Sequence, residues 1–271
     1  MTEHDAPMRR HPVRPPSVLG VTLAASAAIA AITATAAPAG AATLVRGAVE
    51  AAAGGLSWWK AAVLGVVEGV TEFLPISSTG HLLVTEHLLG LDTGAYSKAA
   101  DTYAIAIQFG AILAVAGLFW RRFVDMFEGL LGRFPAGRQL LVNLVVAFLP
   151  AAVVGFLFDD AIKERLFGPW PVVAAWTVGG LLILVLDRTG RLPSRGEPQP
   201  DARPPVFDVT LRQAAVIGVA QCLSLWPGTS RSLVTILAAL LVGLDMVAAV
   251  EFSFLLGFVT LSAATAFSLL K

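Results

Sequence analysis

Two stretches of this chain, AAVLGVVEGVTEFLPISSTGH (Ala61–His81) and AAVIGVAQCLSLWPGTSRS (Ala214–Ser232), are copies of one motif. Each copy opens with an apolar run, breaks at a proline and continues into a turn rich in serine and threonine. Glu68 of the first copy falls opposite Gln221 of the second. Ionisable side chains at membrane depth are costly, so they indicate a functional site. Hydrophobic segments interrupted by proline at corresponding positions of two halves predict a site where two repeats meet.

The composition around these motifs is that of a membrane protein. Of the 271 residues, 56% are hydrophobic and only 14% are charged, and the mean hydropathy is +0.75. A soluble domain of this length needs a more polar surface, so we expect an all-α protein that crosses the bilayer several times. The formal net charge of zero argues against nucleic acid as a partner. The single cysteine, Cys222, excludes an internal disulfide and is interpreted as a packing residue.

Apolar segments long enough to cross a bilayer follow each other along the chain. They lie near 102–120, 140–158, 171–187 and 250–270, with the two broken segments near 57–90 and 211–243. Residues 1–50 form an N-terminal extension in which arginines precede a long alanine-rich stretch. This pattern is typical of a signal peptide and equally of an extra membrane helix, and the sequence leaves both interpretations open.

We therefore divide the rest of the chain into two membrane repeats joined by a linker. The first repeat covers 57–187 and the second covers 211–271, while the segment 188–210 is rich in proline and arginine, which is typical of a flexible linker. Three spans follow the first motif but only one follows the second. We therefore expect the second repeat to be incomplete.

The distribution of arginine predicts how the repeats lie in the membrane. Arginines gather in the loops near 121–138 and 188–212, and the positive-inside rule places both loops in the cytoplasm. Two spans separate these loops, so the two placements agree. The first broken segment then lies on the outer side, and the second enters from the inner side. The fold expected is an inverted repeat in which two broken, re-entrant helix pairs meet at the active site.

The first motif carries two carboxylates, Glu68 and Glu72, on one face of a helix. Two carboxylates in a medium of low dielectric constant repel each other unless a cation lies between them. They are candidates to bind a divalent cation, Mg²⁺ or Ca²⁺, and Glu72 is also a candidate general base because it lies nearer the break. The alternative is that both are structural acids with backbone or hydroxyl partners.

The turn after the first break reads Ser77-Ser78-Thr79-Gly80-His81. Helix capping explains one of these hydroxyl groups but not three together with a histidine. Ser78 and His81 are three residues apart, so on a helix the hydroxyl and the imidazole are expected to be neighbours. That spacing suits a nucleophile with its base, or two groups that bind one phosphate.

The second motif supplies a cation at the start of a helix. Thr229 or Ser230 can cap this helix, whose free backbone N–H groups attract anions. Arg231 in the first turn is unfavourable with the helix dipole, and a bound anion would remove that conflict. A guanidinium binds phosphate oxygens in pairs. The alternative is a buried ion pair between Arg231 and Glu72 or Glu68, and the two states could alternate as substrate displaces the pair.

At these residues the chain resembles the undecaprenyl-diphosphate phosphatase family, which is also called the bacitracin-resistance family. The resemblance is carried by EGVTEFLPISSTGH (Glu68–His81), PGTSRS (Pro227–Ser232), QFGAILAV (Gln108–Val115) and EFSFLL (Glu251–Leu256). It runs from about Trp58 to the end of the chain. After SRS, the chain has Leu233 and Val234 where the family often has small residues.

The resemblance implies an integral membrane hydrolase of the bacterial plasma (inner) membrane whose active site faces the outer side. It would remove the terminal phosphate of a C55 polyprenyl diphosphate with the help of a divalent cation, and so recycle the carrier lipid for peptidoglycan synthesis. A homo-oligomer is compatible with the resemblance. The implied residues are Glu72, Ser78, His81 and Arg231 for catalysis, Ser77, Thr79, Thr229, Ser230, Arg231 and Thr235 for substrate binding, and Glu68 and Glu72 for the metal.

Two other functions remain open at this point. Inverted repeats with broken helices are also a transporter architecture, so the same arginine and hydroxyl groups could carry a polyprenyl phosphate across the membrane. A flippase needs to bind phosphate but needs no nucleophile, so the pair Ser78 and His81 favours the phosphatase. The third reading is a membrane scaffold that keeps the motifs without catalysis.

Overall fold

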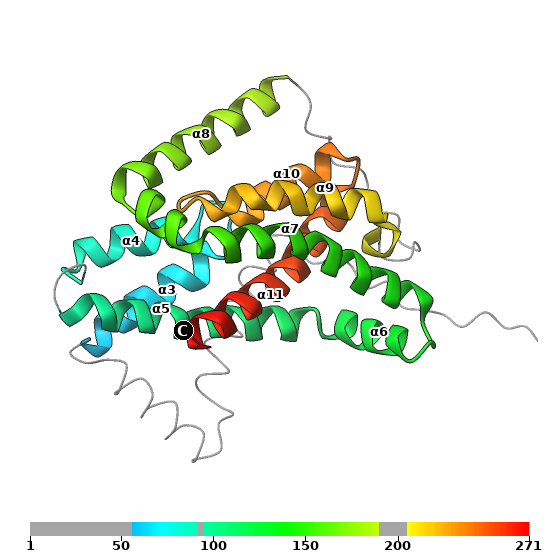
Figure 1. Cartoon of the computed structure of the whole chain (residues 1–271), viewed down its shortest axis with the longest axis horizontal. Coiled ribbons are helices and arrows are strands. Elements are labelled where there is room, and N and C mark those ends of the chain that lie inside the picture. The colour runs from blue at the N-terminus through cyan, green and yellow to red at the C-terminus, as the bar shows by residue number, and fades with distance from the viewer. Residues whose placement is uncertain (1–55, 92–94, 190–204, 271) are drawn as a thin grey trace, which may run out of the picture.

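The computed structural model describes residues 56–91, 95–189 and 205–270, and every regular element within these ranges is a helix. The expectation of an all-α membrane protein is confirmed. The N-terminal extension expected at 1–50 lies outside the described residues. Figure 1 shows the helices packed side by side and crossing one another, with α8 leaning away from the others.

The unbroken spans appear where the hydropathy placed them. Within the described residues, three helices are long and apolar enough to cross a bilayer, namely α7 (Pro135–Leu166), α8 (Pro169–Arg188) and α11 (Met246–Leu270). Helix α5 (Ala95–Leu118) meets the short helix α6 (Trp120–Leu130) at a bend of 73°, and this apolar pair has the length of one broken span or of a re-entrant loop. The protein is therefore a multi-pass membrane protein.

The two motifs form broken helices, as their prolines predict. The first runs through α3 (Trp58–Thr71), a turn that holds Pro75, and α4 (Ser78–Leu88). The second runs through α9 (Leu211–Gln221), the short 3-10 helix η2 (Cys222–Leu225), a turn that holds Pro227, and α10 (Arg231–Leu241). Proline lacks the N–H that would continue a helix, so the chain turns at both prolines. That the two repeats enter from opposite faces stays a prediction.

Helix α11 lies at the centre of this arrangement. It packs against α5, α7 and α10, and half of its membrane-spanning window is buried inside the protein. Phe252, Leu255 and Leu256 of α11 are fully buried, and they share a core with Ala147 of α7 and Ile217 of α9. Figure 1 shows α11 running obliquely among these helices. Because α11 touches both halves of the chain, it sets how the two broken helices face each other.

Two segments between the expected spans contain helix. The segment near 159–170 is helical as far as Leu166, because α7 continues through it and Lys163 pairs with Asp159 at 3.0 Å. The end of the 188–210 linker forms the short helix η1 (Pro205–Asp208). Val206 and Phe207 are buried there, because this part of the linker is apolar and packs into the core. The C-terminal end of the predicted linker is therefore part of the packed structure.

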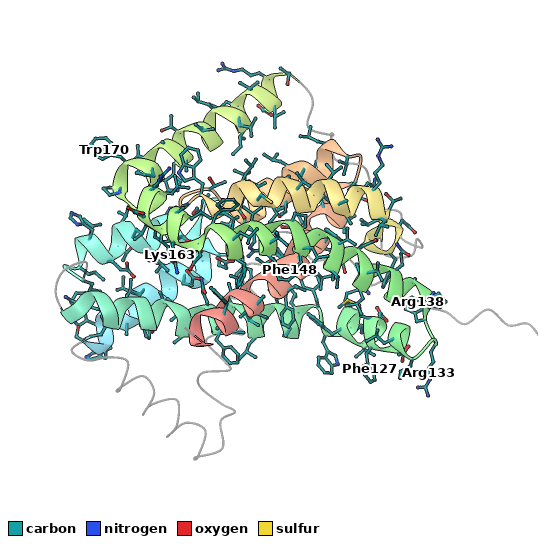
Figure 2. The ribbon with its side chains drawn as sticks, viewed as in Figure 1. Phe127, Arg133, Arg138, Phe148, Lys163 and Trp170 are labelled. Atoms are coloured by element: carbon teal, nitrogen blue, oxygen red, sulfur yellow. The ribbon has the colours of Figure 1, made fainter. Side chains whose placement is uncertain are left out.

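The bend after α5 exposes a basic, aromatic corner of the molecule. Phe127 lies on the outer side of α6, and Arg133 and Arg138 flank the turn into α7 (Figure 2). By contrast, Arg122 turns inward, where its Nε donates to Glu251 on α11 at 2.5 Å and its Nη1 donates to Asp125 at 3.2 Å. This ion pair ties the start of α11 to α6, which gives Glu251 of the EFSFLL segment a structural role.

The crossing of α7 and α9 gives a stability prediction. Gly218 of α9 lies against the backbone of α7, so a Cβ there would sit 2.7 Å from Cα of Ala147. Gly218→Ala should lower the free energy of unfolding by about 1–3 kcal/mol, the usual result of overpacking. Denaturant unfolding in detergent would measure it. Gly180→Ala on α8, where a Cβ meets nothing within 4 Å, is the control and should be neutral. If Gly218→Ala is as stable as the unchanged protein, this account of the crossing is contradicted.

Candidate functional site

A cavity of about 170 Å³ lies where the two broken helices meet. The polar residues of both motifs line it: Thr71, Glu72, Ser77, Ser78 and Thr79 from the first, and Ser224, Thr229, Ser230, Arg231 and Ser232 from the second. Helices α5 and α11 close its sides through Gln108, Thr260, Leu261 and Ala264. The expected meeting of the two motifs in one site is therefore present in the structure.

The walls of the cavity are built from matching positions of the two copies. Counting from the prolines, Ser77 matches Thr229 and Ser78 matches Ser230, so a hydroxyl faces the cavity from each repeat. At the next position the copies differ, because Thr79 is matched by Arg231. The cavity is thus nearly symmetric in its hydroxyl groups but carries its positive charge on one side. Such asymmetry gives a bound anion one preferred orientation.

The two turns after the breaks are held by serine caps. The hydroxyl of Ser77 accepts a hydrogen bond from the backbone N–H of Gly80 at 3.4 Å, and that of Ser230 accepts one from the N–H of Leu233 at 3.2 Å. Ser77 has a φ of 71°, a left-handed conformation that residues other than glycine rarely adopt outside functional sites. As a result, both α4 and α10 begin at the wall of the cavity, and helix N-termini favour anions.

Glu72 bridges the two motifs. Nη2 of Arg231 donates to one carboxylate oxygen of Glu72, and Oγ of Ser78 donates to the other at 2.5 Å. The side chains of Glu72 and Arg231 are only 9% and 15% exposed, so water screens this ion pair weakly. The buried pair that the sequence left open as an alternative is present, and it includes the candidate nucleophile.

Ser78 therefore has a different partner from the one expected. We predicted a contact between Ser78 and His81 from their spacing, but the hydroxyl of Ser78 bonds to Glu72. Ser78 is the first residue of α4, and side chains of a helix tilt toward its N-terminus. Its hydroxyl consequently points back across the break to the end of α3. The spacing rule applies within a helix and does not include the groups that lie before its first turn.

His81 lies behind the turn and not on the cavity wall. Its Nδ1 is 2.8 Å from the carbonyl oxygen of Ser77, and a carbonyl can only accept, so Nδ1 carries the proton. The ring packs against the indole of Trp176 on α8, with ring centroids 5.0 Å apart. Nε2 is left as the nitrogen that can exchange a proton with a ligand.

Arg231 is held in place by α11. Its guanidinium lies directly over Gly257, where a Cβ would come within 2.7 Å of Cζ. Its Nη1 makes a long hydrogen bond of 3.5 Å to the carbonyl oxygen of Ser253, one turn earlier on α11. Any side chain at position 257 would therefore displace the guanidinium. Glycine is needed here for close approach.

Thr235, which was predicted to bind substrate, is not among the residues that line the cavity. It is almost fully buried beneath Arg231. Its hydroxyl bonds to the carbonyl oxygen of Arg231 at 2.9 Å and lies 2.6 Å from Oγ of Ser253. A threonine one turn along a helix commonly bonds back in this way, which removes its hydroxyl from ligand binding. Thr235 instead fastens α10 to α11.

Glu68 is the candidate metal ligand with the most unusual environment. It is 1% exposed, and neither carboxylate oxygen accepts a hydrogen bond from any residue in the described part of the chain. It lies within electrostatic reach of Glu72 and Arg231. No cluster of three or more His, Cys, Asp or Glu that could hold a metal occurs within 56–91, 95–189 and 205–270. Among the described residues, a cation held here would have only the carboxylates of Glu68 and Glu72 as charged protein ligands, and Mg²⁺ is a cation that often binds through one or two carboxylates and substrate phosphates.

Several residues of the cavity were not singled out from the sequence, and three of them are polar residues outside the two turns. Gln108 of α5 opens the QFGAILAV segment, Ser224 of η2 matches Thr71 in the repeat, and Thr260 lies on α11. Ser224 could have been found by carrying the alignment of the two copies three positions further than Gln221. Gln108 and Thr260 could not, because a single polar residue in an apolar helix does not reveal which neighbour it faces.

The close packing of the Arg231 guanidinium on Gly257 gives a binding prediction. Gly257→Ala should weaken the binding of inorganic pyrophosphate at least about tenfold, because one charge-assisted hydrogen bond is worth about 1.5–3 kcal/mol. Isothermal titration calorimetry of the full chain in detergent would measure it. Gly117→Ala on α5, where a Cβ meets nothing within 4 Å, is the control. A stable Gly257→Ala variant with unchanged affinity would contradict the role given to this glycine.

Comparison with known proteins agrees with the motifs. The family model of the bacitracin resistance protein BacA matches residues 61–271. An undecaprenyl-diphosphatase of Sorangium cellulosum is 51% identical over 215 residues, which cover 79% of this chain and 67% of that protein. Undecaprenyl-diphosphatase 2 of Rhodospirillum rubrum is 48% identical over 213 residues, which cover 78% of this chain and 73% of that protein.

Proposed function

The chain belongs to the family of the bacitracin resistance protein BacA, and we propose that it removes the terminal phosphate of undecaprenyl diphosphate. The relatives at about half identity carry the name of that activity. The observation that carries the proposal is the bridge at Glu72, which joins a serine hydroxyl and a guanidinium at one cavity. The product, undecaprenyl phosphate, returns to peptidoglycan synthesis as the carrier lipid.

The cavity binds the diphosphate through its positive side. Nη2 of Arg231 is engaged by Glu72, whereas Nη1 makes only a long bond to Ser253, so Nη1 and Nε remain for phosphate oxygens. The N-termini of α4 and α10 and the hydroxyls around them add neutral donors; these are the hydroxyls of Ser77, Thr79, Thr229 and Ser230. The apolar tail of the substrate extends into the bilayer.

Ser78 is the nucleophile and Glu72 is its base. Oγ of Ser78 attacks the terminal phosphorus while its proton passes to the carboxylate of Glu72, which already accepts that hydrogen bond. The bond from phosphorus to the bridging oxygen breaks, and undecaprenyl phosphate leaves. Water then attacks the phosphoserine, and its proton passes to Nε2 of His81 through a second water, because His81 lies behind the cavity wall. The Oγ–phosphorus bond breaks, and Oγ recovers its proton from Glu72.

A divalent cation, Mg²⁺ or Ca²⁺, completes the site as a cofactor. Glu68 and Glu72 would hold it together with oxygens of the substrate. When bound, it neutralises the charge that develops on the transferring phosphate. The buried, unpartnered carboxylate of Glu68 supports this assignment, since a buried anion is otherwise costly.

The location proposed is the bacterial plasma (inner) membrane with the cavity open to the outer side. Arginines of the 121–138 and 188–212 loops support a cytoplasmic position for those loops, from which the outward position of the first motif follows. The relatives from Sorangium cellulosum and Rhodospirillum rubrum are bacterial proteins. Cysteine substitutions labelled from either side of intact cells would test this orientation.

Release of phosphate from undecaprenyl diphosphate tests the activity. The purified full chain should release phosphate with Mg²⁺ and stop when the metal is chelated. Ser78→Ala should lower turnover at least about a hundredfold and retain substrate, because it removes the nucleophile only. Arg231→Ala should lose both binding and turnover. Thr189→Ala is the matched control, because Thr189 is an exposed residue just after α8.

The outcomes of this experiment separate the candidate functions. Acid-quenched protein should contain phosphoserine at position 78, and turnover that survives Ser78→Ala would show that water is the nucleophile instead. If the chain binds the lipid and releases no phosphate under any condition, the phosphatase is refuted and the carrier of polyprenyl phosphate is favoured.

The metal assignment makes its own prediction. Glu68→Gln should weaken Mn²⁺ binding at least about tenfold, because the neutral amide lacks the charge of a carboxylate. Electron paramagnetic resonance of added Mn²⁺ would measure binding independently of turnover. Glu128→Gln, an exposed acid on α6, is the control and should leave the Mn²⁺ signal unchanged. Equal Mn²⁺ affinity in Glu68→Gln and the unchanged chain would exclude Glu68 as a ligand.

A further inference from the structure

Helix α8 contacts the rest of the protein through one narrow face. Only 17% of its membrane-spanning window is buried, and Figure 1 shows it diverging from the other helices toward its C-terminal end. The face that does make contact contains Val172, Ala175, Trp176 and Gly179, which recur at helical spacing. These four residues touch the two turns in which the broken helices are interrupted, or the helices next to them.

The first two of these residues hold the turn of the second motif. Gly228 has a φ of 92°, and a Cβ there would sit 2.9 Å from the backbone of Val172 and 3.1 Å from Cβ of Ala175. Nε1 of Trp226 donates to the carbonyl oxygen of Pro171 at 3.1 Å. The start of α8 is therefore fixed against the turn that leads to Arg231.

One turn further along α8, Trp176 holds the turn of the first motif. Its indole lies on the backbone of Gly80, where a Cβ would come within 2.7 Å of the ring. The same indole packs on the ring of His81 at 5.0 Å between centroids and 48° between planes. His81 is thus held on two sides, by Trp176 and by the hydrogen bond from Nδ1 to the carbonyl oxygen of Ser77.

The chemistry of the contact favours a role beyond packing. Nε1 of Trp176 is buried with no hydrogen-bond partner among the residues that the structure describes. Phenylalanine would fill the same space without that unsatisfied N–H. The indole is therefore not the choice that stability alone would make at this position.

We propose that Trp176 is a positioning residue for His81, which fixes the plane of the imidazole so that Nε2 can take the proton of the attacking water. The catalytic part of this inference rests on the phosphatase proposed above. The same face of α8 also holds the turn at Gly228, which leads into α10. Trp176 therefore keeps His81 at a set distance from Arg231, the first residue of α10.

A double-mutant cycle between Trp176 and His81 tests the proposal. Trp176→Ala should lower kcat about tenfold or more with KM within about twofold, and Trp176→Phe should recover most of that loss. In a His81→Ala background, Trp176→Ala should cause no further loss of kcat. Trp170→Ala is the control, since Trp170 is 81% exposed at the start of the same helix and points outward (Figure 2).

Nitrogen NMR of labelled histidine separates failure of this proposal from failure of the proposed function. The chain has only four histidines, so His81 is assigned by the signal that His81→Ala removes. Trp176→Ala should shift that signal and speed exchange of the proton on Nδ1, whether or not the protein hydrolyses the lipid. An unchanged His81 signal, or an equal loss of kcat in the presence and absence of His81, would overturn the positioning role.

Gly80 supplies an independent test of the contact. Gly80→Ala should lower thermal stability because its Cβ would press on the indole, and adding Trp176→Ala should restore that stability. The double variant should then match Trp176→Ala in kcat. If the second substitution destabilises the protein further, Trp176 does not lie on Gly80 and the proposal fails.

Discussion

The carboxylate of Glu72 is shared between the guanidinium of Arg231 and the hydroxyl of Ser78, and the arrangement of the molecule depends on that shared anion. Removing one partner of a buried ion pair leaves an uncompensated charge that costs about 3–5 kcal/mol, so the pair holds the two broken helices at one separation. The same groups are the ones that phosphoryl transfer requires. Structure and chemistry therefore use one contact, and a substrate phosphate can compete for the guanidinium without leaving Glu72 unpaired.

Glycines let the surrounding helices pack closely around this contact. Within a bilayer, helices gain little from burying apolar surface against each other, so close backbone approach and polar contacts hold them together. Gly257 lets the guanidinium rest on α11, Gly218 lets α9 cross α7, and Gly80 admits the indole of α8. Each of these helices thereby sets the place of a group in or beside the cavity. The aliphatic remainder of α8 stays outward, toward lipid.

Much of this arrangement could be predicted from the sequence, and the exceptions have physical causes. Apolar length predicts spans because backbone groups in lipid must bond within a helix, and proline predicts the breaks. The predicted partner of Ser78, His81, was wrong because spacing along α4 takes no account of Glu72, which lies before the break. The hydroxyl of Thr235, which was assigned to substrate, bonds within α10 and to Ser253 of α11, and the sequence does not reveal the second of these contacts. Contacts between helices that are distant in the sequence, such as Trp176 on Gly80, cannot be predicted from the spacing of residues along the chain.

The contact between Glu72 and Arg231 joins residues that are 159 positions apart. A ribosome that has just released the first motif into the membrane has not yet made the second. Until α10 arrives, the carboxylate lacks its guanidinium and α4 lacks the opposite wall of the cavity. The hydrolytic site therefore cannot exist on a partly inserted chain, and the nascent protein is inert toward the lipid carriers around it. Its chemistry begins only when the last helices of the site have docked.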